Sequence, residues 1–190
     1  MEVLSGVFSA FGLSASAGLN AYIPLLTISL LAKFTDLITL EKPWDALTSW
    51  WIIGLLIVLL LVEIVADKVP AVNHVNDAIQ TFVRPAAGAI AFAASAKVLS
   101  DVHPILAMAT GILVAGSVHA VKSGAIRPAV TATTGGVGNV PVSILEDILS
   151  TITSILAIVI PILIGFLVIL LLILIIYWLW KRSQRTQPIS

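Results

Sequence analysis

One uninterrupted apolar stretch, residues 160–180, most constrains how this chain can fold. It reads IPILIGFLVILLLILIIYWLW and contains no charged residue. About 20 apolar residues are enough for a helix to cross the hydrocarbon core of a bilayer, so this stretch predicts a membrane-spanning helix. The whole chain agrees, because 59% of its 190 residues are hydrophobic and 11% are charged, whereas soluble domains carry about 25% charge. The sequence therefore predicts an integral membrane protein whose surroundings are the lipid bilayer.

The alternation of apolar and polar stretches divides the chain into membrane segments. Because each span needs about 20 apolar residues, we predict an all-α membrane protein, a polytopic bundle of about five or six segments. These segments form one domain over residues 1–180, and residues 51–69 are its most apolar central span. Residues 181–190 form a basic tail. The positive-inside rule places such a tail in the cytoplasm.

The C-terminal apolar region is too long for one straight span. Ser143 and Glu146 have the spacing of a capping box, so a helix is predicted to begin there. A helix over 144–180 would be roughly 55 Å long at 1.5 Å per residue, which exceeds the thickness of a bilayer. Pro161 is therefore expected to kink this helix, because proline removes one backbone hydrogen bond.

Composition also excludes several classes of protein. The formal net charge is zero, which gives no basis for nucleic-acid binding. The absence of cysteine excludes disulfides and thiol chemistry. No serine lies in a GxSxG nucleophile elbow, so we expect no enzyme activity and no cofactor.

Residues 60–85, LLVEIVADKVPAVNHVNDAIQTFVRP, begin inside an apolar run and then carry five charged residues: Glu63, Asp67, Lys68, Asp77 and Arg84. Glu63 lies roughly 18 Å along a helix from Trp51, inside a hydrocarbon core of about 30 Å. Glu63 and Asp67 are four residues apart and share one helix face. An ionised carboxylate inside a bilayer costs several kcal/mol unless it is paired or hydrated. The pair is therefore predicted to bind a coupling proton or cation. The alternative is a structural ion pair with one of the chain's basic residues: Lys68, Arg84, Lys97 or Arg127.

The second half of this stretch has two interpretations. Asp67, His74 and Asp77 are weak candidates for a metal site, since carboxylate and imidazole groups bind Mg²⁺, Mn²⁺ or Zn²⁺. The favoured interpretation is a short interfacial helix over 71–84, after a break at Pro70, with its polar face in water. A separate small-residue span, 86–99, would follow it.

Two stretches predict interrupted helices. Gly18 and Pro24 flank Asn20, which favours a broken helix there. The stretch 122–141, KSGAIRPAVTATTGGVGNVP, carries too many glycines and prolines for a regular helix and is expected to be re-entrant or broken. Exposed N–H groups of a glycine-rich bend beside basic residues can bind an anion. The alternative is a hinge between helices. The candidate substrate-binding residues are Asn20, Lys122, Arg127, Gly135, Gly136 and Asn139.

A shift of 104 residues aligns NAYIPLLT with GAIRPAVT, so that Pro24 meets Pro128 and Thr27 meets Thr131. The match supports either an internal repeat, with halves 5–99 and 104–180, or biased composition. Transporters are commonly built from such repeats, with discontinuous helices that meet near the midplane.

Three motifs carry a resemblance to a known family: GLNAYIP, DKVPAVNHVNDAIQTFVRPAAGA and the stretch 122–141. They resemble an uncharacterised family of small bacterial integral membrane proteins, catalogued as domain of unknown function 4126. The resemblance implies a multi-pass protein of the bacterial inner (cytoplasmic) membrane. It implies no activity.

These patterns favour a small transporter or lipid-headgroup flippase for an anionic substrate, coupled to a proton or cation at Glu63 and Asp67. One alternative is a non-catalytic subunit or assembly factor, as a homo-oligomer or with partner subunits. Its small-residue faces, 86–96 and 107–120, would dock partner helices. A passive ion channel is the second alternative.

Overall fold

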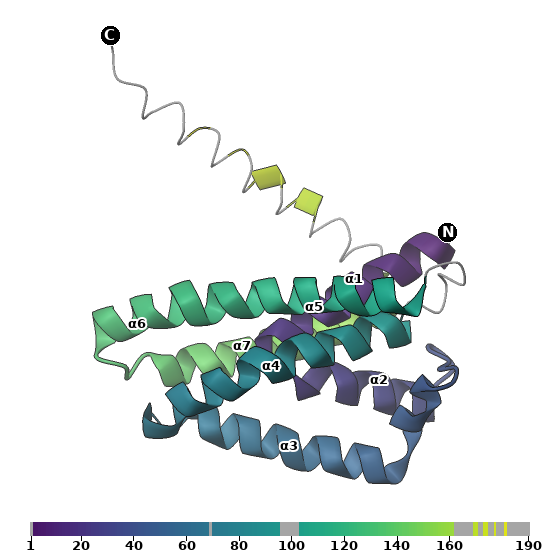
Figure 1. The fold of residues 1–190 in the computed structure, drawn as a ribbon, viewed down its shortest axis with the longest axis horizontal. Helices are drawn as coiled ribbons and strands as arrows, with labels where there is room; N and C mark the ends of the chain where they lie inside the picture. The colour runs from purple at the N-terminus through teal and green to yellow at the C-terminus, as the bar shows by residue number, and fades with distance from the viewer. Residues whose placement is uncertain are drawn as a thin grey trace.

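The computed structural model describes residues 2–68, 70–95 and 103–161, with a few isolated positions beyond Pro161. Every regular element in these ranges is a helix (Figure 1), which confirms the all-α prediction. The elements are α1 (Glu2–Leu19), α2 (Tyr22–Phe34), the 3₁₀ helix η1 (Trp44–Thr48), α3 (Trp50–Lys68), α4 (Pro70–Ser95), α5 (Pro104–Val121), the π-helical turn η3 (Lys122–Ile126), α6 (Arg127–Thr134) and α7 (Asn139–Val159).

Three helices in the described part are long and apolar enough to cross a membrane: α3, the continuous helix Pro104–Thr134 formed by α5, η3 and α6, and α7. The helices α1 and α2 are shorter and also apolar. The chain is therefore an all-α membrane protein. The helix α7 ends at Val159, because a proline disfavours helical backbone at the preceding residue, Ile160. Most of the predicted last span and of the tail 181–190 lies outside the described residues.

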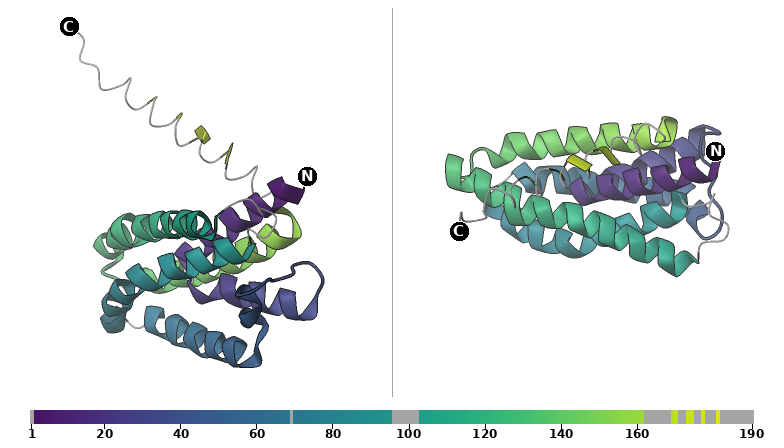
Figure 2. Two further views of the ribbon diagram at one scale, coloured as in Figure 1. Left: turned by 45° about the vertical axis from the view of Figure 1, so that its right-hand side comes forward. Right: turned by 90° about the horizontal axis from the view of Figure 1, so that it is seen from above.

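The helices α1 and α2 form a helical hairpin (Figure 1). The chain breaks at Asn20 and Ala21, as predicted. The start of α1 and the segment after α2 lie at the same end of the bundle (Figures 1 and 2), where Ser5 and Ser9 line a cavity of about 220 Å³ together with Ile38 and Thr39. The tip of the hairpin therefore lies inside the bundle, among α3, α5 and α7.

Small residues let the helices approach closely. The Ser14 hydroxyl of α1 donates to the carbonyl oxygens of Gly88 in α4 (3.2 Å) and Gly111 in α5 (2.9 Å). On the other side of α1, Ser16 Oγ lies 2.7 Å from both Ser150 Oγ and Ser154 Oγ of α7. The alanines of α4 that face this crossing are buried within the chain, so much of the predicted docking surface 86–96 is used internally. Of the second predicted surface, 107–120, only Ala107, Gly111, Ala115 and His119 are buried.

Two predictions about local structure are wrong, and a third is correct only in part. The segments 71–84 and 86–99 are not an interfacial helix and a separate span, because α4 continues through Pro85 from Pro70 to Ser95. The stretch 122–141 is broken, as predicted, but only at the turn 135–138; residues 122–134 are helical, since the π-helical turn keeps the chain in a helix across Gly124. Ser143 is not a cap: α7 begins at Asn139, and the Ser143 hydroxyl lies inside the bundle.

Candidate functional site

Seven charged side chains from α3, α4, η3, α6 and α7 meet in the bundle, and we call them the ion network. Six of these side chains are 6% exposed or less. Taking an ion out of water costs several kcal/mol, so each buried charge needs a partner. The network consists of Glu63, Asp67, Asp77, Arg84, Lys122, Arg127 and Glu146.

Arg84 joins α3, α4 and α5. Its Nη2 donates to Glu63 Oε1 at 2.8 Å, and both side chains are at most 1% exposed. Its Nη1 lies 3.1 Å from Nδ1 of His119. The other ring nitrogen of His119 lies 3.2 Å from the Thr81 hydroxyl. Arg84 is therefore the partner of Glu63.

Arg127 is bound by three carboxylates. Its Nη1 donates to both oxygens of Asp77, at 2.9 and 3.0 Å. Its Nη2 donates to Asp67 Oδ2 at 2.9 Å and to Glu146 Oε2 at 3.3 Å. Because a guanidinium offers several donors in a fixed plane, one arginine can hold α3, α4 and α7 together.

Asp67 has donors at both oxygens. In addition to Arg127, Asn76 Nδ2 donates to Asp67 Oδ1 at 2.7 Å, and the Ser143 hydroxyl donates to Oδ2 at 3.2 Å. This carboxylate is fully satisfied by the protein.

The hairpin tip contacts the network through Lys122. Lys122 Nζ lies 2.7 Å from Glu146 Oε2 and donates to the backbone oxygen of Leu19 at 2.9 Å. Leu19 is the last residue of α1, where helix carbonyls lack partners and a cation is favoured. The lysine therefore satisfies the broken end of α1.

Asn20 satisfies the other side of the break. Its Oδ1 accepts from the backbone N–H groups of Tyr22 and Ile23, at 3.0 and 3.1 Å, and so caps α2. Its Nδ2 donates to Asp147 Oδ1 at 2.9 Å, and Asp147 also lies 3.5 Å from Lys68 Nζ. The tip is thus bound on both sides by charged residues of the second half of the chain.

Replacing Asn20 with alanine is expected to lower the free energy of unfolding by about 1 kcal/mol or more, because an N-cap is lost. Thermal unfolding of the purified protein in detergent measures this. Thr27→Val is the matched control, since the Thr27 hydroxyl bonds only the Ile23 carbonyl of its own helix. Equal melting temperatures for the two variants would show that the cap and the Asp147 bond contribute nothing.

The ion network is unbalanced. Its four carboxylates face three cations, so its formal charge is −1 when every group is ionised. The neighbouring pair of Lys68 and Asp147 leaves this value unchanged. A net charge in a low-dielectric interior is costly. The network holds one carboxylate more than it holds cations.

The structure brings most of the predicted site residues together. Glu63, Asp67, Lys122 and Arg127 belong to one network, and Asn20 lies at the tip that contacts it. The predicted glycine-rich anion cradle is separate from it: Gly135 is exposed and Gly136 lies in the same turn between α6 and α7.

Sequence reasoning missed several roles. Asn139 donates to Thr131 Oγ1 at 2.8 Å and takes no part in the network. Glu146 was considered only as a helix cap, although it binds both Lys122 and Arg127. Arg84 was one of four candidate partners for Glu63. One feature of the sequence does point to Arg84: it is a charged residue beside a proline in an apolar stretch, and a charge in such a stretch needs a buried partner.

The weak metal candidates do not form a site among the described residues, where no cluster of three metal-binding side chains occurs. Asp67 and Asp77 both accept from Arg127, whose positive charge opposes a cation there. The side chain of His74 lies outside the described residues.

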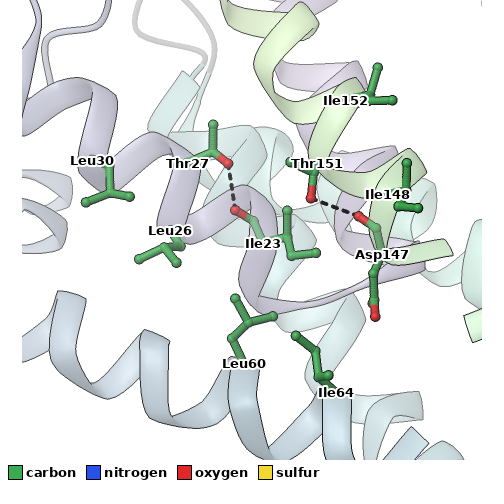
Figure 3. A pocket seen from close by; sticks show the side chains of 10 residues that line it. All are labelled: Ile23, Leu26, Thr27, Leu30, Leu60, Ile64, Asp147, Ile148, Thr151 and Ile152. Atoms are coloured by element: carbon green, nitrogen blue, oxygen red, sulfur yellow. Dashed lines mark hydrogen bonds between the residues drawn. The ribbon is translucent and has the colours of Figure 1, made fainter. Parts of the chain in front are cut away.

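A groove of about 450 Å³ lies between α2, α3 and α7 (Figure 3). Leu26, Leu60 and Ile152 are among its apolar lining residues, and Asp147 contributes a charged group. The hydroxyl of Thr151, which also lines it, donates to a carbonyl of its own helix at 2.8 Å. The groove is therefore largely hydrocarbon, with the carboxylate that binds the hairpin tip in its lining.

A family model described as Domain of unknown function (DUF4126) matches residues 7–182. This range contains every residue of the ion network. Searches of curated proteins and of solved structures find no match.

Proposed function

Because the chain belongs to the family described as Domain of unknown function (DUF4126), we propose a function from its site: a small membrane transporter for an anionic substrate, coupled to a proton or cation. The observation that carries this is the buried ion network beside the tip of the hairpin that α1 and α2 form. Ionisable groups inside membrane domains typically belong to ion and substrate pathways. Helix breaks near the midplane are typical of substrate sites in transporters.

The two predicted coupling carboxylates differ in their surroundings. Asp67 is satisfied by Arg127, Asn76 and Ser143, so its role is to fix the position of Arg127. Glu63 Oε2 is buried and has no hydrogen-bond partner in the structure. We therefore assign the coupling ion to Glu63.

The anion would bind where Glu146 now lies. Lys122 and Arg127 converge on the same oxygen, Glu146 Oε2, at 2.7 and 3.3 Å. This carboxylate occupies the position that a phosphate or carboxylate of a substrate would take between the same two cations. Transport would then exchange the internal anion for the external one, and the hairpin tip would move with Lys122.

The groove favours the flippase form of this function. A lipid has an acyl chain and a polar headgroup, and the groove combines a hydrocarbon lining with Asp147, beside Lys68 and Asn20. An acyl chain in the groove would place the headgroup near the hairpin tip. The subunit alternative loses one of its two expected docking faces, because alanines of 86–96, such as Ala91, are fully buried within the chain, whereas most of 107–120 is not.

The setting that we propose is the bacterial inner membrane, with the C-terminus in the cytoplasm. The basic residues that follow the last apolar stretch support this orientation: Lys181, Arg182 and Arg185.

Replacing Glu63 with glutamine is expected to abolish coupled transport while the bundle stays folded, because glutamine imitates a permanently protonated carboxyl. Proteoliposomes loaded with a pH-sensitive dye would be challenged with inorganic phosphate and simple carboxylates. A parallel assay would follow a fluorescent phospholipid between leaflets. Asp45→Asn, at an exposed residue of η1, is the control and should behave as wild type. Unchanged movement in the Glu63 variant would exclude it as the coupling group.

A further inference from the structure

Among the buried polar atoms that lack hydrogen-bond partners in the described part of the chain, two belong to the ion pair of Glu63 and Arg84, and a third belongs to Gln80, one helical turn before Arg84. They are Glu63 Oε2, Gln80 Oε1 and Arg84 Nε. The three side chains are at most 2% exposed. Arg84 already binds the other oxygen of Glu63 at 2.8 Å, and Gln80 precedes Arg84 by four residues, on the same face of α4. An unsatisfied buried polar atom costs about 1–3 kcal/mol, so this grouping requires an explanation.

We propose that these atoms form a proton site in which Glu63 carries the coupling proton on Oε2 and Gln80 Oε1 accepts a hydrogen bond from it. This inference rests on the proposed function and specifies its coupling ion. Protonation forms one O–H bond and leaves the bond between Arg84 and Oε1 intact. It also removes the excess negative charge of the ion network, because four carboxylates face three cations.

In the deprotonated state, the same atoms match one water molecule. Water can accept one hydrogen bond from Arg84 Nε and donate two, to Glu63 Oε2 and Gln80 Oε1. Buried waters typically make about three hydrogen bonds to polar groups that lack other partners. Such a water would deliver the proton to Glu63 and receive it again.

A metal cation fits this place poorly. It would lie against the Arg84 guanidinium, and like charges disfavour each other in a low-dielectric interior. The free oxygens are one carboxylate atom and one amide atom, whereas Ca²⁺ takes six to eight oxygen ligands. A proton needs a single acceptor.

Groups on every packed helix set the field at Glu63. On its own helix lies Asp67, four residues away. From α2, Tyr22 lies beside Gln80 and within electrostatic reach of Glu63 and Arg84. Lys122 of η3 also acts on Glu63, and it is bound in turn by Glu146 of α7. His119 lies behind Arg84 on α5. Because several charged groups surround Glu63, the test must identify Glu63 itself.

Infrared difference spectroscopy of the reconstituted full-length protein tests this, with the pH lowered in steps and no substrate present. The expected result is the carbonyl stretch of one protonated carboxyl in the wild type, absent in Glu63→Gln. In Glu63→Asp the band should remain at a changed frequency, which guards against a variant that fails to fold. In Gln80→Leu it should move to higher frequency, because the acid hydroxyl has lost its acceptor. Glu41→Gln, in an exposed loop, should change nothing.

Persistence of the band in Glu63→Gln would overturn the proposal, as would a band that sodium ions remove at constant pH. The outcome is separable from that of the transport assay. A titrating Glu63 without movement of anion or lipid would exclude the proposed transporter and leave the proton site. Coupled movement without a Glu63 band would exclude the proton site and leave the transporter.

Discussion

Replacing Arg127 with leucine is expected to lower the free energy of unfolding by about 3–5 kcal/mol or more, the typical cost of removing one partner of a buried ion pair. The effect is large because three carboxylates, Asp67, Asp77 and Glu146, share this one guanidinium. Without it their mutual repulsion in a low-dielectric interior is no longer offset. Thermal unfolding in detergent, together with the yield of monodisperse protein, measures the loss.

Two variants separate charge from geometry at this position. Arg127→Lys keeps the positive charge but cannot reach three carboxylates from one planar group, so its stability should lie between those of the wild type and Arg127→Leu. Lys42→Leu, at an exposed loop residue, should leave stability unchanged. If the melting temperature of Arg127→Leu equals that of the wild type, Arg127 does not hold the helices together.

Replacing Gly111 with leucine is expected to disrupt the crossing of α1, α4 and α5, at a cost of about 1–3 kcal/mol or more for overpacking. A Cβ atom at Gly111 would lie 2.7 Å from the Cα of Ala89 and also against the carbonyl of Gly88. Both neighbours are backbone, which cannot rotate away. The readouts are melting temperature and elution as a single species in size-exclusion chromatography.

Gly54→Leu is the matched control for this substitution. Gly54 also lies in an apolar helix, but a Cβ atom there would meet nothing within 4 Å. The two variants add the same side chain to the same kind of helix, and only the Gly111 variant should be destabilised. Equal behaviour of the two would mean that α4 and α5 do not approach each other as closely as the structure has them.

Much of the site could be predicted because charge inside an apolar chain is conspicuous. Glu63 and Asp67 were identified from their depth along one helix. The break at Asn20 followed from Gly18 and Pro24, which weaken a helix on either side of it. Each of these features depends only on residues within one or two helical turns, so the sequence is enough to recognise it.

Two features could not be predicted in this way: which charged residues bind each other, and where a helix continues past a proline. Pro85 and Pro128 suggested helix ends, yet α4 continues through Pro85, and the helix formed by α5, η3 and α6 continues past Pro128, directly after its π-helical turn. Arg84 and Arg127, each next to one of these prolines, bind carboxylates of other helices, and such tertiary contacts override local preferences. Gly135 and Gly136, with φ of 63° and 91°, do end the helix.

The proposed internal repeat stays a prediction, and the structure adds one observation to it. The offset of 104 residues places Asn20 and Ala21 on Gly124 and Ala125, which lie in the π-helical turn η3. Both alignments thus coincide with a departure from α-helical backbone. The continuations differ, since α2 folds back from α1 whereas α6 continues from α5 in one helix.

The hairpin tip also determines the order in which this protein can be assembled. Leu19 and Asn20 are made early in synthesis, but their partners Lys122 and Asp147 follow 103 and 127 residues later. Backbone groups at a helix break are not tolerated in lipid until protein satisfies them. We therefore expect the nascent chain to complete its N-terminal hairpin only after α7 has been synthesised.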